Sequence, residues 1–431
     1  MKRKFCFVLT FMFLLMNIVP ISAQETSLPL QSEAVILIEE NTGKVLYEKN
    51  SSQKMYPAST TKVLTALIAL ENADLNEVIK VGNEVYQVPL DASKAGHNPG
   101  DEITLKDLVT SLLLPSGNDS AFVIASYLAK KNTGNDSLDI NSAMTEFAAI
   151  MNERAKEIGV KNSNFVNPHG YHNENHYTTA YDLALITREA LKNPVFREIV
   201  KQPSANIGSE SSPNQQKLSF RNRNLLLDSR NSNTYYPYAT GVKTGFTDEA
   251  GECLVASATK DNLNLIAVLL NSPVDARWND AKTLFDYGFE NFQFHQVAKK
   301  GDIIDKVYVD KHSPKGPSEL EVLIKEDYTG LFHKNDISRI QKTISWAQEP
   351  LVAPITEGQN VGEVTFTLDG EVLSKIELIA KYGIEKRTIW DVMFSINAIP
   401  YWCGGIGGVL ILFTISNAIR KRKSRRGFHF K

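Results

Sequence analysis

A serine and a lysine three residues apart, Ser59 and Lys62, stand in the segment PASTTK just before an apolar run. The apolar side chains that follow recur at helical spacing, which predicts a buried helix with Ser59 at or near its first turn. Residues three apart share a helix face, so the hydroxyl and the amine can meet. Such a pair could act as nucleophile and base, because a hydroxyl is a weak nucleophile until a base takes its proton. The same spacing also arises by chance, with a capping serine and a solvated lysine.

Two further short motifs follow in the chain. Ser116-Gly117-Asn118 interrupts a helical region, and such a break is either a plain connector or a turn that aims a hydroxyl and an amide into a cleft. Lys243-Thr244-Gly245 lies in a β-like run, where the glycine would let another backbone approach closely. Each tripeptide alone is a weak signal. In the order S-x-x-K, S-G-N, K-T-G, on a helix, a helix junction and a strand, the set is specific.

This ordered set resembles the serine D-alanyl-D-alanine carboxypeptidases, the low-molecular-mass penicillin-binding proteins. The resemblance runs from about residue 30 to 385 and includes the segments NPHG, AYDLA, NRN and TDEAGECLVASAT. It implies an α+β fold of the DD-peptidase/β-lactamase type, an antiparallel sheet with helices on both faces. It also implies that the protein removes the terminal D-alanine from peptidoglycan stem pentapeptides through an acyl-serine, that β-lactam antibiotics inhibit it covalently, and that it needs no cofactor.

The resemblance also implies a role for each matching residue. Ser59 is the nucleophile, Lys62 the base, Ser116 a proton relay, and Asn118 a ligand of the substrate amide. Lys62 must be neutral to act as a base, and we expect burial and the nearby cation Lys243 to lower its pKa. The resemblance further implies a set of substrate-binding residues: Lys243, Thr244, Gly245 and Phe246 on the strand, with Arg223 and Arg277 near the substrate carboxylate.

Some of these roles have plainer alternatives. Each arginine could equally form a surface salt bridge. The backbone N–H groups of Ser59 and Phe246 are the expected oxyanion donors, so the identity of the second side chain matters little. By resemblance, His169 pairs with Asp182 and braces the loop beside the site.

Three histidines, His169, His172 and His176, have a spacing that could suggest zinc. No H-E-x-x-H accompanies them and they fall in a polar segment, so we predict no metal site. The lone Cys253 follows the third motif, and a single buried thiol is usually inert.

Other functions compete with carboxypeptidase activity. A DD-endopeptidase or transpeptidase would use the same acyl-enzyme, because only the acceptor differs. A β-lactamase needs a deacylating glutamate, and the nearest match, Glu189, is 71 residues past Asn118, too far for that pattern. A silent wall-binding protein would have no need of an intact Ser59 and Lys62.

The patterns around these motifs predict how the chain folds. Residues 33–51 read as a hairpin, residues 104–129, 143–158 and 181–192 as helices, and residues 241–272 as strands followed by a closing helix. Strands at both ends with helices between them predict an antiparallel sheet built from both termini. Short alternating strands from residue 296 predict a separate small all-β domain.

The two ends of the chain have the composition of membrane-targeting segments. Residues 1–23 combine a basic start, an apolar core and a small final residue, typical of a secretory signal peptide; an uncleaved anchor is the alternative. Residues 399–419 hold no ionised side chain and are long enough to cross a bilayer, and six basic residues follow in 420–426. These features predict a single-pass protein of the cell membrane with its C-terminus in the cytoplasm and its catalytic body outside.

The complete domain prediction follows from these boundaries. It comprises a signal peptide (1–23), a DD-peptidase domain (28–293), a small β domain (296–385), a juxtamembrane segment (386–398), a transmembrane anchor (399–419) and a basic tail (420–431).

Charge and cysteine content exclude some classes of protein. Of the 47 lysines and arginines, three lie in 1–23 and seven follow Asp391, which leaves 37 against 49 acidic residues in the exported body, a net charge of about −12. A nucleic-acid partner is therefore not expected. Cys253 has no partner in that body, so no intramolecular disulfide is expected.

Overall fold

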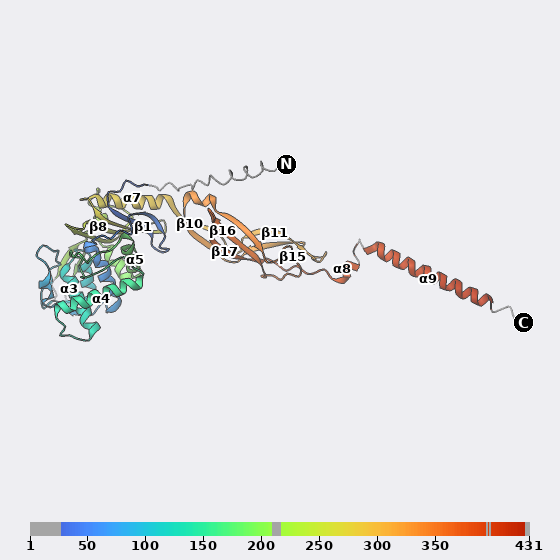
Figure 1. Ribbon diagram of the computed structural model, residues 1–431, viewed down its shortest axis with the longest axis horizontal. Helices are drawn as coiled ribbons and strands as arrows, with labels where there is room; N and C mark the ends of the chain where they lie inside the picture. The colour runs from blue at the N-terminus through green and yellow to red at the C-terminus, as the bar shows by residue number, and fades with distance from the viewer. Residues whose placement is uncertain (1–26, 209–216, 394, 396–397, 427–431) are drawn as a thin grey trace, which may run out of the picture. The chain divides into compact units, whose positions relative to one another are not determined.

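The computed structural model describes residues 27–208, 217–393, 395 and 398–426 (Figure 1). The predicted signal peptide lies outside these residues. The chain divides into two compact units, one up to Glu290 and one from Asn291.

The first unit is built on a five-stranded antiparallel sheet in the order β2-β1-β9-β8-β7. Its strands are β1 (Ala34–Glu39), β2 (Val45–Lys49), β7 (Ala239–Thr247), β8 (Gly251–Lys260) and β9 (Leu263–Ser272). The first strand pairs with the last along its whole length, from Ala34 opposite Leu270 to Glu39 opposite Leu265. The prediction of a sheet assembled from both ends of the unit is confirmed, and β7 forms one edge of it.

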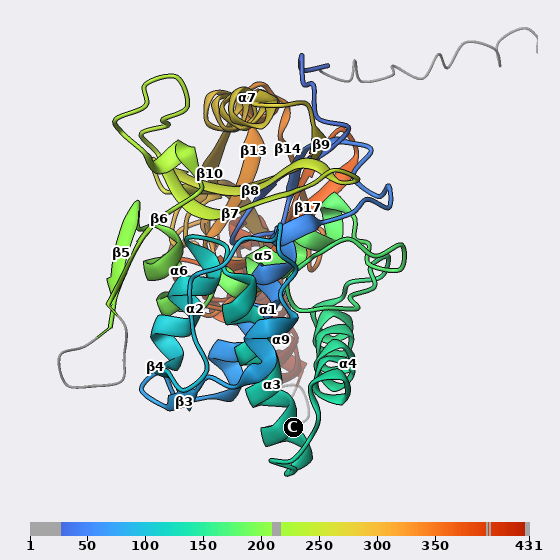
Figure 2. The same cartoon turned by 90° about the vertical axis from the view of Figure 1, so that its left-hand side faces the viewer.

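Helices cover both faces of this sheet (Figure 2). One face carries α1 (Lys62–Asn72), α5 (Ala180–Leu191) and α6 (Pro194–Val200). The other face carries α7 (Ala276–Asn291), which packs so closely that a Cβ on Gly288 would lie 2.6 Å from the Leu265 side chain. The apolar stripe of α1, Val63, Leu64 and Leu67, is fully buried in the core, as the sequence periodicity predicts.

The remaining helices of this unit are α2 (Leu105–Leu113), α3 (Asn118–Thr133) and α4 (Ile140–Ile158). Side-chain caps fix where several helices begin: the Thr104 hydroxyl accepts the Asp107 N–H at the start of α2, and the Thr179 hydroxyl accepts the Asp182 N–H at the start of α5. Two small antiparallel ribbons complete the unit, β3 (Val78–Lys80) with β4 (Glu102–Thr104), and β5 (Ser204–Ile207) with β6 (Leu218–Arg221).

The second unit contains an all-β domain followed by two helices. A six-stranded sheet has the order β14-β16-β17-β12-β11-β15, and β10 pairs with β13 separately. The strands are β10 (Phe292–Ala298), β11 (Ile303–Asp310), β12 (Glu319–Ile324), β13 (Tyr328–His333), β14 (Gln341–Trp346), β15 (Leu351–Val352), β16 (Asn360–Leu368) and β17 (Glu371–Ala380). Alternate residues such as Leu320, Val322 and Ile324 are buried, as expected for strands with one face on a core.

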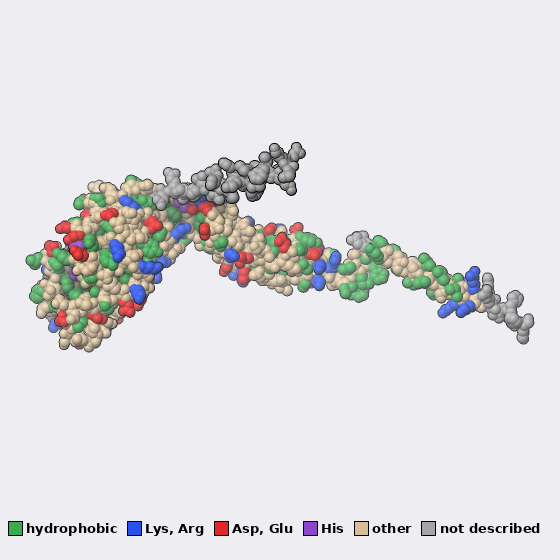
Figure 3. All heavy atoms as spheres, viewed as in Figure 1, with side chains coloured by type: hydrophobic (Ala, Val, Ile, Leu, Met, Phe, Trp, Pro, Cys, Tyr) green, Lys and Arg blue, Asp and Glu red, His purple; other side chains and the backbone are tan. Residues whose placement is uncertain are grey.

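Two helices follow the β domain, α8 (Ile389–Met393) and α9 (Ile399–Arg426). Within α9, Ile399–Lys423 is long and apolar enough to cross a membrane. Figure 3 shows hydrophobic side chains along this helix and lysines and arginines gathered toward its C-terminal end. The C-terminal apolar helix of the predicted fold class is therefore present.

Candidate active site

Ser59 lies in a 3₁₀ turn, η1 (Ala58–Thr61), that leads directly into α1. In a 3₁₀ turn the side chains of residues three apart stand almost directly above one another, which brings Ser59 over Lys62. The Thr60 hydroxyl donates to the Pro57 carbonyl at 2.6 Å, and the Thr61 hydroxyl donates to the Ala58 carbonyl at 2.9 Å. These bonds hold the turn that presents the Ser59 hydroxyl to a cleft.

The Lys62 amine is fully buried and touches three oxygen atoms. Its Nζ lies 2.9 Å from Ser59 Oγ, 2.8 Å from Asn118 Oδ1 and 2.8 Å from the backbone oxygen of His169. Asn118 is the first residue of α3, and His169 lies in the loop before α5. Three separate segments therefore meet at one amine.

Burial lowers the pKa of Lys62 well below its ordinary value, the Arg223 charge lowers it further, and the Asp119 carboxylate opposes the shift. The shift favours the neutral amine, which has two N–H groups and one lone pair. Asn118 Oδ1 and the His169 carbonyl can only accept hydrogen bonds, so they take the two N–H groups. The lone pair is left to accept the Ser59 hydroxyl proton, which is the geometry that a general base needs.

The Ser116-Gly117-Asn118 turn is held by a residue that sequence reasoning did not identify, Ser93. Ser116 has a left-handed backbone, with φ of +67°, and its carbonyl accepts the Ser93 hydroxyl at 2.7 Å. The Ser93 carbonyl in turn accepts the backbone and side-chain N–H groups of Asn118 at 2.9 and 3.0 Å. These contacts hold the Ser116 backbone and the Asn118 side chain, and both residues line the same cleft as Ser59.

The neighbouring Asp119 anchors the loop that carries Ser93. Its carboxylate, buried at the start of α3, accepts the N–H groups of Ala95, Gly96 and His97 at 2.7 to 3.0 Å. A carboxylate is also stabilised at a helix N-terminus by the helix dipole. No short motif in the sequence marks this loop as part of the site.

Strand β7 lies directly against the serine turn at Gly245. A Cβ at this position would be 3.0 Å from the Ser59 nitrogen and 3.0 Å from the Pro57 oxygen. The close approach predicted for this glycine is therefore observed. Phe246, the next residue, lines the cleft together with Ser59 and is 57% exposed.

Lys243 differs from its prediction in position. Its side chain is buried, does not line the cleft, and donates to the Thr244 carbonyl at 2.8 Å. Burial lowers its pKa well below the ordinary value, and the charges of Lys62, Arg223 and Arg277 add to the shift. Lys62 and Lys243 repel each other when both are charged, and the charge of Arg223 lowers the pKa of each of them.

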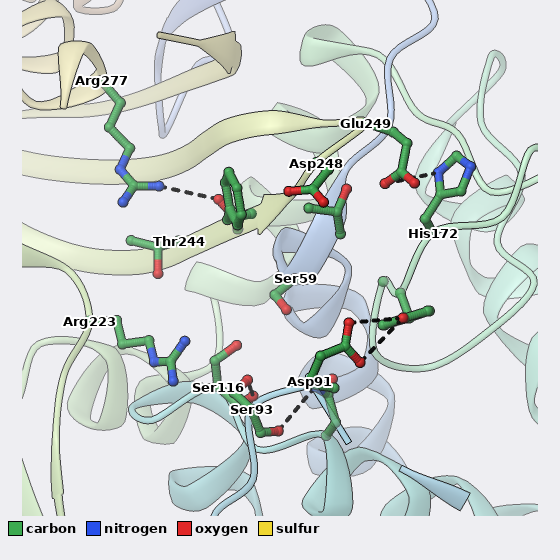
Figure 4. Close-up of a pocket in the computed structure, with 17 residues that line it drawn as sticks. Ser59, Asp91, Ser93, Ser116, His172, Arg223, Thr244, Asp248, Glu249 and Arg277 are labelled. Atoms are coloured by element: carbon green, nitrogen blue, oxygen red, sulfur yellow. Dashed lines mark hydrogen bonds and ion pairs between the residues drawn. The ribbon is translucent and has the colours of Figure 1, made fainter. Parts of the chain in front are cut away.

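The cleft around Ser59 has a volume of about 500 Å³ and opposite charges at its two ends (Figure 4). Arg223, Arg277 and Thr244 lie on one side of Ser59. Arg277 Nη1 donates to the Gly245 carbonyl at 3.2 Å, and its Nε lies 3.3 Å from Glu252, so the sequence-predicted arginine is held beside β7.

The opposite side of the cleft is acidic. The residues there are Asp91, Tyr171, His172, Asp248 and Glu249. The Tyr171 hydroxyl donates to Asp91 at 3.2 Å, and His172 Nδ1 lies 3.8 Å from Glu249. Sequence reasoning assigned none of these residues to substrate binding.

The predicted pairing of His169 with Asp182 is not formed. The Asp182 carboxylate instead accepts hydrogen bonds from residues 161–163: the N–H groups of Lys161 and Asn162 and the Ser163 hydroxyl. His169 Nδ1 instead accepts the Tyr171 N–H at 3.0 Å. The contribution of His169 to the site is its backbone carbonyl, which contacts Lys62.

The other two histidines, His172 and His176, have separate partners. His172 lies beside Glu249, as described above. His176 Nε2 lies 2.8 Å from the Thr61 hydroxyl, and His176 Nδ1 accepts the Val166 N–H. Burial lowers the pKa of His176 to about 3.

Among the residues that the structure describes, no group of three His, Cys, Asp or Glu side chains is arranged to hold a metal. Cys253 is buried, and burial raises its pKa to about 11, so it is a neutral thiol.

Comparisons with known proteins agree with this site. Residues 21–274 match the peptidase S11 family, D-alanyl-D-alanine carboxypeptidase, and residues 292–386 match the C-terminal domain of penicillin-binding protein 5. The D-alanyl-D-alanine carboxypeptidase DacF of Bacillus subtilis is 33% identical over 362 residues, 83% of this chain and 86% of that protein. DacC of Escherichia coli is 28% identical over 390 residues, 87% of this chain and 90% of that protein.

Solved structures give the same result. Penicillin-binding protein 5 of Haemophilus influenzae superimposes with a TM-score of 0.59 at 26% identity, covering 84% of this chain and 99% of that chain. A mutant of the Streptomyces K15 DD-transpeptidase superimposes with a TM-score of 0.55 at 30% identity, covering 61% of this chain and all of that chain. The chain therefore belongs to the D-alanyl-D-alanine carboxypeptidase family of serine hydrolases, and a penicillin-binding protein 5 C-terminal domain follows the catalytic unit in the sequence.

Proposed function

We propose that Ser59 removes the terminal D-alanine from peptidoglycan stem pentapeptides through an acyl-serine intermediate. The observation that carries this proposal is the buried Lys62 amine, whose two obligate acceptors leave its lone pair for the Ser59 hydroxyl. No cofactor enters the reaction.

Acylation begins when Ser59 Oγ attacks the carbonyl of the penultimate D-alanine while its proton passes to Lys62 Nζ. The backbone N–H groups of Ser59 and Phe246 stabilise the oxyanion that forms. The C–N bond then breaks, and the Ser116 hydroxyl relays the proton from Lys62 to the departing amine of D-alanine. Water, deprotonated by the same lysine, hydrolyses the ester and restores Ser59.

Substrate recognition uses the free edge of β7 and the basic end of the cleft. The substrate backbone adds as a further strand along Thr244–Phe246, and Asn118 holds its amide. Arg277, Arg223 and the Thr244 hydroxyl bind the terminal carboxylate, since charged donors hold a carboxylate best. Lys243 supports this end of the cleft from behind.

A β-lactam presents its amide to the same groups and acylates Ser59. A DD-endopeptidase or transpeptidase would share every step up to the acyl-enzyme. A β-lactamase is disfavoured because Glu189 forms ion pairs with Arg154 and Lys192 on the outer surface of α5 and does not line the cleft.

The composition of the two ends of the chain supports a reaction outside the cell. We assign residues 1–23 to a secretory signal peptide, 28–293 to the catalytic domain, 296–385 to the β domain, 386–398 to a juxtamembrane segment, 399–419 to a single-pass anchor and 420–431 to a cytoplasmic tail. The support is the apolar α9, which ends in basic residues. Peptidoglycan is then reached from the membrane surface.

The reaction is tested with a D-Ala-D-Ala pentapeptide and the solubilised protein, with and without a free amine acceptor. Release of one D-alanine per peptide with little transfer to the amine supports carboxypeptidase activity, and Ser59→Ala serves as the inactive control. Predominant transfer to the amine would favour a transpeptidase, and equal release by the Ser59→Ala variant would exclude the proposed nucleophile.

A further inference from the structure

A second groove lies beyond the acidic end of the catalytic cleft and has no role in the mechanism above. Its volume is about 340 Å³, within the range of roughly 300–1,000 Å³ that is usual for small-molecule sites. The residues that give it chemical character are Lys54, Tyr56, Glu174, Tyr177, Glu249 and Ala250.

The groove and the cleft share a wall. Glu249 lines both of them. His172, which lines the cleft, lies 3.8 Å from Glu249 and meets the Tyr56 ring edge-on at 4.7 Å between ring centres. The cleft and the groove therefore adjoin at Glu249.

The direction of β7 leads a bound stem peptide toward this groove. With its carboxylate at Thr244, a substrate strand that pairs with the edge of β7 runs toward Thr247, where the strand ends. Residues 248–250 then turn into β8 and reach the groove at Ala250. An extended peptide advances about 3.3 Å per residue, so a stem of five residues spans roughly 16 Å. Its first residue, and the sugar attached to it, would lie past this turn.

The polar groups of the groove are available to a ligand. Within the described residues, the Tyr56 and Tyr177 hydroxyls make no hydrogen bond and Glu174 makes no ion pair. Lys54 has one contact there, with its amine 4.1 Å from the centre of the Tyr177 ring. Hydroxyls, carboxylates and an ammonium around aromatic and small apolar side chains suit a sugar, which has apolar C–H faces and many hydrogen-bonding groups.

We propose that this groove binds the N-acetylated amino sugar to which the stem peptide is attached. The proposal rests on the proposed function, because the orientation of the substrate comes from the catalytic cleft. In this proposal the enzyme recognises both the peptide and the glycan of its substrate, and Glu249 lies where the two sites meet.

The test compares two substrates, a D-Ala-D-Ala pentapeptide and the same peptide on its amino-sugar disaccharide. For the wild-type protein we expect the sugar to raise kcat/KM about tenfold, the effect of one or two hydrogen bonds. In the double variant Lys54→Ala/Glu174→Ala this advantage should disappear while turnover of the free peptide stays unchanged. A matched control, Glu153→Ala/Lys156→Ala, removes the same two residue types from exposed positions on α4 and should retain the advantage.

Equal turnover of both substrates by the wild-type protein, or an equal loss on both in the double variant, would overturn the glycan site and leave the carboxypeptidase intact. Equilibrium dialysis of the labelled disaccharide against the solubilised full-length protein gives a second readout that needs no turnover. If neither peptide is hydrolysed, the proposed function fails, and dialysis still decides whether the groove binds the sugar.

Discussion

Replacing Arg277 by alanine should weaken the enzyme specifically toward substrates that carry a free terminal carboxylate. Arg277 lines the cleft on the same side as Thr244 and Arg223. Two of its contacts, with the Gly245 carbonyl at 3.2 Å and with Glu252 at 3.3 Å, hold the guanidinium in place and leave its other donors for a ligand.

The expected loss follows from the kind of bond removed. A hydrogen bond to a charged group contributes about 1.5–3 kcal/mol. This corresponds to a fall in kcat/KM of roughly 10- to 150-fold on a D-Ala-D-Ala peptide. The same peptide with an amidated C-terminus lacks the charge, so the wild-type protein and Arg277→Ala should turn it over equally poorly.

Kinetics of both proteins on both peptides form a double cycle that isolates the arginine–carboxylate pairing. Truncation also removes the ion-pair partner of Glu252, although Glu252 keeps the Asp275 N–H at 2.9 Å. The double variant Arg277→Ala/Glu252→Gln controls for this carboxylate and should show the same selectivity as Arg277→Ala. If Arg277→Ala slows the acid and the amide alike, the arginine is structural and our assignment of the carboxylate site is wrong.

Three further predictions concern the base, the fold around it and the anchor. Arg223→Gln removes a charge that lowers the pKa of Lys62, so the amine should stay protonated to higher pH. The acid limb of the kcat/KM profile should therefore shift to higher pH, and an unshifted limb would contradict the electrostatic role of Arg223. Gly170→Ala should lower the free energy of unfolding by several kcal/mol in denaturant unfolding, because its Cβ would lie 1.8 Å from a backbone oxygen of the serine turn. The control Gly134→Ala has φ of +63° and open space around it, so it should cost only about 1–2 kcal/mol. Equal losses for the two glycines would argue against that contact. Truncation before Thr388 should release a soluble active body from the membrane fraction, and an inactive product would show that the span supports the site.

The parts of the molecule that the sequence predicts well depend on local patterns. The buried stripe of α1 follows from residues spaced three and four apart, and the strands from their apolar runs. The pairing of β1 with β9 could be inferred because one sheet had to bury strands from both ends of the unit. The contact of Ser59 with Lys62 is also local, since the two residues are three apart in one turn.

The parts that the sequence did not predict depend on tertiary distances and on the backbone. The His169 carbonyl contacts Lys62, but a carbonyl group belongs to every residue and has no signature in the residue type. The same holds for Ser93, whose carbonyl holds Asn118. The His169–Asp182 pairing was wrong because Asp182 satisfies backbone N–H groups of its own loop.

Electrostatics at the site could not be ranked from the sequence. Lys243 and Arg223 are both candidates for the cation near Lys62, and their effects depend on burial. Lys243 is almost completely buried and its own pKa is lowered, whereas an arginine keeps its charge under most conditions. Only the folded arrangement distinguishes the two.

The central claim, that Lys62 activates Ser59, is tested most directly by mapping the site and rate of acylation by a labelled penicillin. We expect one label per chain, on the peptide that contains Ser59, and a rate lower by on the order of 10⁴ or more in Lys62→Ala with an unchanged unfolding transition. A label on any other residue, labelling of Ser59→Ala, or near wild-type acylation of Lys62→Ala would contradict it.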